Sequence, residues 1–207
     1  MPRASRAQME SHRHEITSAA SRLFRERGIS GVSIADLMAA AGLTHGGFYG
    51  HFDSKDTLAA AACEEAFSHS SKRWARRVAG KADRSEALKA LVEPYLSLNS
   101  RDKPGTACPA AALVNDVVRE PAGAAVRAAY TDGLEKLVHV LASVQFTGVN
   151  ETDRQCALAD LSTMVGALVL ARAARESPLS KEILAATQER LISADGASAI
   201  SANDRQS

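Results

Sequence analysis

The chain has 207 residues, a formal net charge of +1, 45% apolar residues and 4% aromatic residues. This length is enough for one or two domains with buried cores, and the near-neutral charge excludes a polycation. The three cysteines are far apart and form no CxxC pair or Cys/His cluster, which argues against a zinc domain and predicts free thiols in a reducing compartment.

Nothing near the N-terminus resembles a signal peptide. The longest apolar stretch, about 161–171, is interrupted by Ser and Thr and is shorter than a bilayer-spanning helix. We therefore expect a cytoplasmic protein that does not enter a membrane.

Apolar residues recur with helical spacing, and no segment alternates like a strand. The pattern predicts three short N-terminal helices, at 11–27, 33–41 and 44–50. Gly28 and Gly42 stand where the first two should end. Ser33 and Asp36 have capping-box spacing, and Thr44 can begin the third helix.

Six further helices follow, at 55–79, 84–98, 109–120, 122–146, 151–176 and 179–193. Gly80 should end the first of them, and 99–107, which contains proline and glycine, predicts a loop. Pro109 suits the first position of its helix. The tail, 194–207, is small and polar and is predicted to be disordered. The sequence thus predicts an all-α fold of about nine helices.

Three short helices joined by tight turns predict a helix-turn-helix unit at about 33–52, in a DNA-binding domain at 1–54. Residues 1–55 carry seven Lys or Arg against five Asp or Glu, a mild excess that fits an anionic partner. The stretch GLTHGGFYGHF, 42–52, nevertheless places Gly46, Gly47 and Gly50 in one short helix, where each costs roughly 1 kcal/mol relative to alanine. We interpret them as allowing the backbone to approach phosphates and base edges closely.

The segment SIADLMAAAGLTHGGFYGHFDSKDTL, at 33–58, resembles the DNA-binding domain of TetR-family (TetR/AcrR-like) transcriptional regulators. The resemblance implies an all-α homodimer whose N-terminal head binds a palindromic operator in double-stranded DNA. It also implies a C-terminal domain, 55–193, that binds a small-molecule effector. The residues that the resemblance places at the DNA are Ser33, Thr44, His45, Gly46, Gly47, Tyr49, His51 and Lys55.

The sequence departs from the family pattern at two positions. Lysine often stands at the position of His45, and a larger polar residue often stands at that of Gly50. Few side chains therefore remain for direct readout. The possible sources of specificity are His45, an arm with Arg3 and Arg6 in the minor groove, and DNA shape.

Several large or reactive side chains are candidates for the effector site: Phe67, Trp74, Tyr95, Cys108, Tyr130 and Met164. Cys108 precedes Pro109, so it should cap a helix whose N-terminus favours the thiolate, and Arg101 and Lys103 lie just upstream. Some family members with a cysteine here respond to electrophiles or oxidants, and Cys108 would then be alkylated faster than the other two cysteines. The alternative is a buried packing cysteine, the role that we expect for Cys63 and Cys156.

The helix at 151–176 is apolar nearly all round and needs cover on both faces. The stretch GALVLARAARESPLSKEIL resembles the dimerising helices of the family. The predicted two-fold interface contains Gly166, Ala167, Leu170, Ala171, Ala174, Ile183 and Leu184.

The sequence contains no G-x-S-x-G, H-E-x-x-H, P-loop or dinucleotide-binding motif and no ligand cluster for a metal. We therefore expect no catalysis, no metal and no cofactor. The favoured function is a ligand-responsive DNA-binding regulator, most simply a repressor. The alternative is a helical protein-interaction module without DNA binding, which a nucleic-acid pull-down would distinguish.

Overall fold

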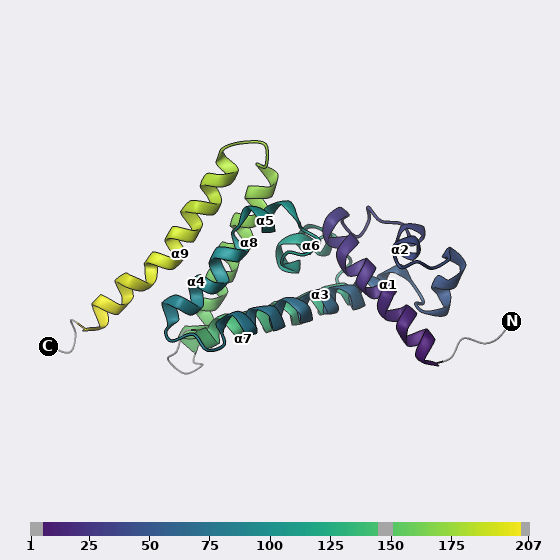
Figure 1. The fold of residues 1–207 in the computed structure, drawn as a ribbon, viewed down its shortest axis with the longest axis horizontal. Coiled ribbons are helices and arrows are strands. Elements are labelled where there is room, and N and C mark those ends of the chain that lie inside the picture. Colours follow the sequence, from purple (N-terminus) through teal and green to yellow (C-terminus); the bar gives the residue numbers. More distant parts are fainter. Residues whose placement is uncertain (1–5, 145–150, 204–207) are drawn as a thin grey trace. The chain divides into compact units, whose positions relative to one another are not determined.

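The computed structural model describes residues 6–144 and 151–203 (Figure 1), with side chains for all of these except 151 and 194–203. These residues form ten helices and no strand, which confirms the predicted all-α fold. The helices are α1 (Arg6–Arg27), α2 (Ile34–Ala40), η1 (His45–Gly50), α3 (Lys55–Val78), α4 (Arg84–Tyr95), α5 (Leu98–Asp102), α6 (Pro109–Val117), α7 (Ala125–Val144), α8 (Glu151–Ala173) and α9 (Leu179–Asn203).

The chain forms two compact units. The first contains the residues up to His69 together with Pro104–Leu134, and the second contains Ser70–Lys103 and the residues from Glu135 onward. Helices α3 and α7 each contribute to both units. These structural units do not coincide with the predicted division after residue 54. That predicted division separates a DNA-binding domain from an effector-binding domain, and it stays a prediction.

The core of the first unit is built on the predicted apolar stripe of α1. Its members are at most 8% exposed: Ile16, Ala19, Ala20, Leu23 and Phe24. Helix α1 packs against α2 and α6, and α2 packs against η1. Because burial of one Leu, Ile or Phe side chain stabilises a fold by about 1.5–3 kcal/mol, this stripe holds the short N-terminal helices together.

Three glycines end helices as predicted. Gly28, Gly42 and Gly80 have φ values of +78°, +72° and +73°, in the left-handed region that other residues rarely adopt. These three positions need glycine for backbone reasons alone.

Several helices differ from the prediction, and α4, α6 and α8 each end three residues earlier than expected. Helix α1 begins at Arg6 instead of 11, and the helix predicted at 44–50 is a 3₁₀ helix. The expected loop at 99–107 begins with α5, because Pro94 disrupts α4 near its end and its carbonyl accepts bonds from the Ser97 and Ser100 hydroxyls (2.9 and 2.7 Å).

A further difference is at the C-terminus. Helix α9 continues to Asn203, so the helix end predicted at 193 is too early. The stretch 194–203 contains four alanines, the residue with the highest helix propensity. The last four residues of the predicted tail lie outside the described residues.

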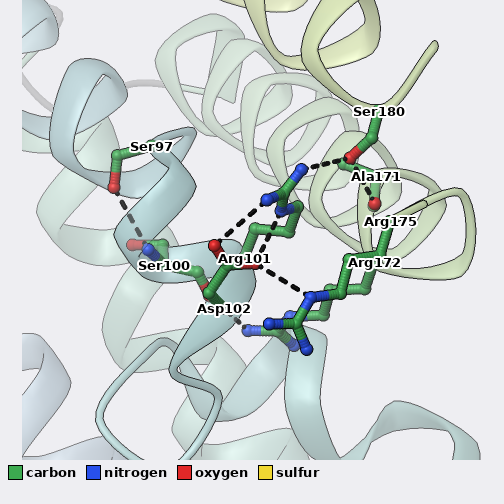
Figure 2. Close-up of polar contacts among 8 residues, drawn as sticks. All are labelled: Ser97, Ser100, Arg101, Asp102, Ala171, Arg172, Arg175 and Ser180. Atoms are coloured by element: carbon green, nitrogen blue, oxygen red, sulfur yellow. Dashed lines mark hydrogen bonds and ion pairs between the residues drawn. The ribbon is translucent and has the colours of Figure 1, made fainter. Parts of the chain in front are cut away.

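In the second unit α8 packs on α9, α5 and α4. A polar cluster joins the short α5 to α8 and α9 (Figure 2). Arg101 donates to both carboxylate oxygens of Asp102 (2.7 and 3.0 Å) and to the Ser180 hydroxyl (2.9 Å), which in turn donates to the carbonyl of Ala171. Arg172 donates to the carbonyl of Ser100 (2.9 Å). These bonds fix α5 against the turn between α8 and α9.

Helix α8 is long and apolar enough, between Thr152 and Ala173, to cross a membrane by length and composition, so the prediction of too short a stretch is wrong. The same test is passed by core helices of globular proteins. Only 33% of the most apolar window of α8 is buried within the chain, and Leu158 and Leu170 are 42% and 59% exposed. A large part of this apolar helix is therefore left for cover by something outside the chain.

Candidate nucleic-acid interface

Helix α2 begins with the predicted capping box. The Ser33 hydroxyl accepts from the Asp36 amide (3.1 Å), and the Asp36 carboxylate accepts from the Ser33 amide (2.9 Å). The same hydroxyl donates to the carboxylate (2.5 Å), and these bonds from Ser33 lower the pKa of Asp36. The Ser33 hydroxyl proton is thus committed to Asp36, and Ser33 would have to release it to donate to a phosphate.

The segment after α2 separates a buried face from an exposed one. Phe48 and Phe52 are 0% and 2% exposed, and their rings stack with centroids 6.0 Å apart. Tyr49 is 67% exposed, and His45 is exposed beside it. Thr44 precedes η1 with an extended backbone, and its side chain makes no capping hydrogen bond, so its hydroxyl is not used to start the helix. The phenylalanines therefore anchor η1, and its polar side chains face solvent.

The glycines of η1 are not required by the fold. A Cβ atom built at Gly46 or Gly50 meets nothing within 4 Å, and one at Gly47 makes an ordinary contact with Met38 Cε at 3.6 Å. None of the three lies in the left-handed region. The described part of the chain would therefore accept alanine at each of these positions.

Two residues of α1 that were not predicted at the DNA contact the end of η1. The Arg13 guanidinium lies over the Phe52 ring, 4.0 Å from its centroid, and Nη1 donates to the carbonyl of His51. The His12 ring meets the His51 ring edge-on, with centroids 5.8 Å apart. Arg13 stands three residues before Ile16, so extending the apolar stripe of α1 by one turn would have placed it on the face that meets η1.

The remaining predicted DNA residues lie at the starts of α3 and α1. Lys55 is the first residue of α3 and is half-buried, and Ser54 caps that helix as predicted by accepting from the Thr57 amide (3.1 Å). Arg6 is exposed within α1 and pairs with Glu10 (3.2 Å). Arg3 lies outside the described residues.

Known proteins share both this segment and the fold. Residues 16–62 match the family described as "Bacterial regulatory proteins, tetR family". The HTH-type transcriptional repressor DhaR of Mycobacterium sp. (strain GP1) is 38% identical over 56 residues, 27% of this chain and 28% of that protein. The reduced form of E. coli NemR superposes with a TM-score of 0.74 at 20% identity, covering 87% of this chain and 94% of that one.

The N-terminal segment of the chain thus matches the TetR family, and the fold of the chain is that of TetR-family structures. A further structural neighbour is the regulator FadR of Bacillus subtilis in complex with stearoyl-CoA, with a TM-score of 0.65 at 17% identity over 87% of this chain and 97% of that one. At these identities the structural likeness concerns the fold. The sequence alignment with DhaR covers little more than a quarter of either protein, so the family assignment rests on the N-terminal segment.

The candidates for the effector site lie in both units. In the first unit the rings of Phe67 and Tyr130 meet edge-on at 5.4 Å, and the Tyr130 hydroxyl donates to the carbonyl of Ala110 (2.7 Å). A Cβ at Gly133 would clash with the Phe67 ring, so α3 and α7 are packed closely there. The second unit holds Trp74 and Tyr95, whose rings meet at 5.7 Å, and Met164. All six candidates are buried, and their role in ligand binding stays a prediction.

The cysteines differ from one another in exposure. Cys108 precedes Pro109 at the N-cap of α6 as predicted, but it is only 4% exposed. Cys63 is buried, and burial raises the pKa of its thiol to about 12. Cys156 is exposed, so the prediction that it packs in the core is wrong; its helix neighbours Gln155 and Ala159 are exposed as well. Because Cys156 is exposed and Cys108 is buried, solvent access argues against the prediction that Cys108 is alkylated first.

The predicted dimer residues include both buried and exposed positions. Ala167, Ala171 and Leu184 are buried within their own unit and are not available to a partner as the chain stands. The other members are exposed or half-buried: Gly166, Leu170, Ala174 and Ile183. Leu179 of α9 is exposed as well, and so is Leu158 of α8, which was not predicted although its helical spacing from this set would have found it.

Proposed function

We propose that this TetR-family chain is a transcriptional repressor that binds a palindromic DNA operator as a homodimer. The main support for this proposal is the presence of three glycines, Gly46, Gly47 and Gly50, in η1. Gly46 and Gly50 face open space, and no contact within the described part of the chain requires glycine at Gly47. Each costs a helix about 0.5–1 kcal/mol relative to alanine, a cost that close approach of a duplex would offset.

The groups beside these glycines suit DNA. Thr44 offers an uncommitted hydroxyl, and the exposed His45 and Tyr49 can reach base edges or phosphates. Lys55 adds a positive charge at the start of α3. The buried Phe48 holds this surface against α2 and leaves its polar side free for a partner.

The dimer that we propose is a two-fold bundle of α8 and α9 from each protomer. The support is the apolar surface that includes Leu158, Leu170 and Leu179, between 42% and 59% exposed. Gly166, which has no neighbour within 4 Å of a built Cβ, allows a second helix to approach closely. Since related copies would meet the same surface, each helix would face its own copy.

Release of DNA would follow from a two-state equilibrium. The dimer would hold its two heads one or more helical turns of DNA apart, and an effector bound to the C-terminal helices would favour a different spacing. FadR, the neighbour solved with stearoyl-CoA, supports a small-molecule effector for the fold. Because Cys108 is buried, we favour a non-covalent effector over covalent modification of this thiol. DNA binding also places the protein in the cytoplasm, and nothing in the proposal requires catalysis.

The test is selection of duplexes from a random-sequence DNA pool by the purified full chain. We expect enrichment of a palindrome with two half-sites, bound by two protomers. Failure to enrich any duplex, combined with capture of protein partners only, would favour the interaction module instead. A selected site without two-fold symmetry would refute the dimer arrangement but not DNA binding.

A further inference from the structure

Three groups that can carry positive charge meet where η1 ends. Arg13 of α1 donates to the carbonyl of His51 and lies over the buried Phe52 ring at 4.0 Å, so its guanidinium is held in place. The His12 ring meets the His51 ring at 5.8 Å, with 76° between the ring planes. His12 and His51 are half-buried and Arg13 is exposed, so a ligand can reach the cluster from solvent.

No acid neutralises this cluster in the part of the chain that the structure describes. Arg6 pairs with Glu10 one turn earlier on α1. An acid of α3, Glu65, does contact this stretch of α1, but it faces His14 (3.8 Å). The groups that act on His51 are His12 and Arg13; burial first, and then these two charges, lower the pKa of His51. An anion bound by His12, Arg13 and His51 would replace the repulsion among their positive charges with attraction to the anion.

The position of the cluster indicates which anion it would bind. Helix η1 has six residues, which at about 2.0 Å per residue span about 12 Å, close to the width of about 12 Å of the DNA major groove. Thr44 stands at one end of η1, and the cluster stands at the other. A helix lying across the groove would therefore meet a phosphate strand at each end. Of the cluster at the second end, only His51 was predicted from the sequence to lie at the DNA.

We propose that His12, Arg13 and His51 bind one phosphate of the DNA backbone, and that DNA binding takes up a proton on this histidine pair. The inference rests on the proposed DNA binding. Arginine has donors to spare beyond the bond to His51, and a protonated imidazole donates from both nitrogens. Because the phosphate favours the protonated histidines, affinity for DNA rises as the pH falls from about 8 to about 6, across the ordinary titration range of histidine.

The experiment measures dissociation constants by fluorescence anisotropy. The probe is a fluorescein-labelled duplex selected by the wild-type chain from a random pool, with a shuffled duplex of equal length beside it. Both are titrated at pH about 6 and about 8 over a series of salt concentrations, which bracket the histidine pKa of ~6.5. The variants are His12→Gln, His51→Gln, the double variant and Arg13→Gln. His69→Gln, at an exposed position of α3, is the matched control.

Wild type should bind both duplexes about tenfold more tightly at the lower pH, the change that one pKa unit on one histidine produces. Each histidine variant should reduce this ratio, the double variant should abolish it, and His69→Gln should keep it. Arg13→Gln should weaken binding at both pH values and lower the slope of log affinity against log salt by about one. Thermal melts at both pH values show that the variants are folded.

Two results would overturn the site while leaving the proposed function intact. The first is DNA binding whose pH ratio survives in the double variant. The second is a ratio that disappears with His45→Gln alone, which would assign the protonation to the base-facing histidine. If no duplex is bound at either pH, the proposed function fails, and the phosphate site fails with it.

Discussion

Alanine at Gly46 should stabilise the protein and weaken DNA binding at the same time. A Cβ at this position meets no atom within 4 Å, and the backbone is outside the left-handed region, so the folded chain accepts it without strain. Alanine also reduces the conformational entropy of the unfolded chain. We expect a gain of about 0.5–1 kcal/mol, which for a chain of this length raises Tm by about 1–4 °C.

The effect on DNA binding has the opposite sign. If η1 lies in the major groove with its backbone against the duplex, an added methyl group holds that backbone off and breaks charge-assisted hydrogen bonds worth about 1.5–3 kcal/mol each. Loss of one such bond weakens binding by about tenfold to a hundredfold. Gly50→Ala should behave in the same way, because its built Cβ also meets open space.

The assay pairs thermal melts with anisotropy titrations of the selected duplex. The matched control is Gly123→Ala, another glycine whose Cβ would meet nothing within 4 Å but which lies between α6 and α7, away from η1. The control should leave affinity unchanged. Unchanged affinity in both Gly46→Ala and Gly50→Ala would refute the reasoning, because these glycines would then have no role at DNA. A fall in Tm would show instead that the fold needs them.

Three further predictions concern the DNA contact, the dimer and the thiols. Lys55→Ala should weaken binding to selected and shuffled duplexes alike and lower the salt slope by about one, as for loss of one phosphate contact; an unchanged slope would remove Lys55 from the interface. Leu170→Glu should place a charge in the proposed apolar interface and give a monomer in sedimentation at micromolar concentration, whereas a persistent dimer would locate the interface elsewhere. Mass-spectrometric labelling near neutral pH should modify the exposed Cys156 before the buried Cys108, and Cys63 last, because its thiol has a pKa of about 12; faster labelling of Cys108 would restore it as a sensor.

Local signals predicted most of the fold because they depend on nearest neighbours in the chain. The apolar stripe from Ile16 to Phe24, the glycines that end helices and the capping box of Ser33 all appear in the structure as expected. The failures involve competing local effects. Pro94 disrupts α4, and its carbonyl then binds two serine hydroxyls that begin α5, a pattern that apolar periodicity does not register.

The residues of the candidate DNA interface likewise include some that local signals predicted and some that they missed. The residues at the start and middle of η1 were predicted because they carry a recognisable pattern. Arg13 and His12 were missed because their significance comes from a contact across 38 residues, between α1 and the carbonyl of His51. Likewise, an apolar helix face does not reveal which side meets its own chain, so Ala171 and Leu170 were placed together although one is buried and the other is 59% exposed.

The short segment after α2 therefore performs two tasks on opposite faces. Its stability comes from Phe48 and Phe52, both buried, and from the caps of α2 and α3 on either side, none of which needs the outward face. The outward face can then carry the residues that we propose contact DNA, including glycines that lower helix stability by roughly 1 kcal/mol each. Arg13 extends this arrangement, because its contact with Phe52 fixes the end of η1 while the residue stays exposed to solvent. A substitution at these positions that changes the stability of the fold and the affinity for DNA in different directions is therefore the most direct evidence. It shows whether the residue acts in the buried face or in the outward face of η1.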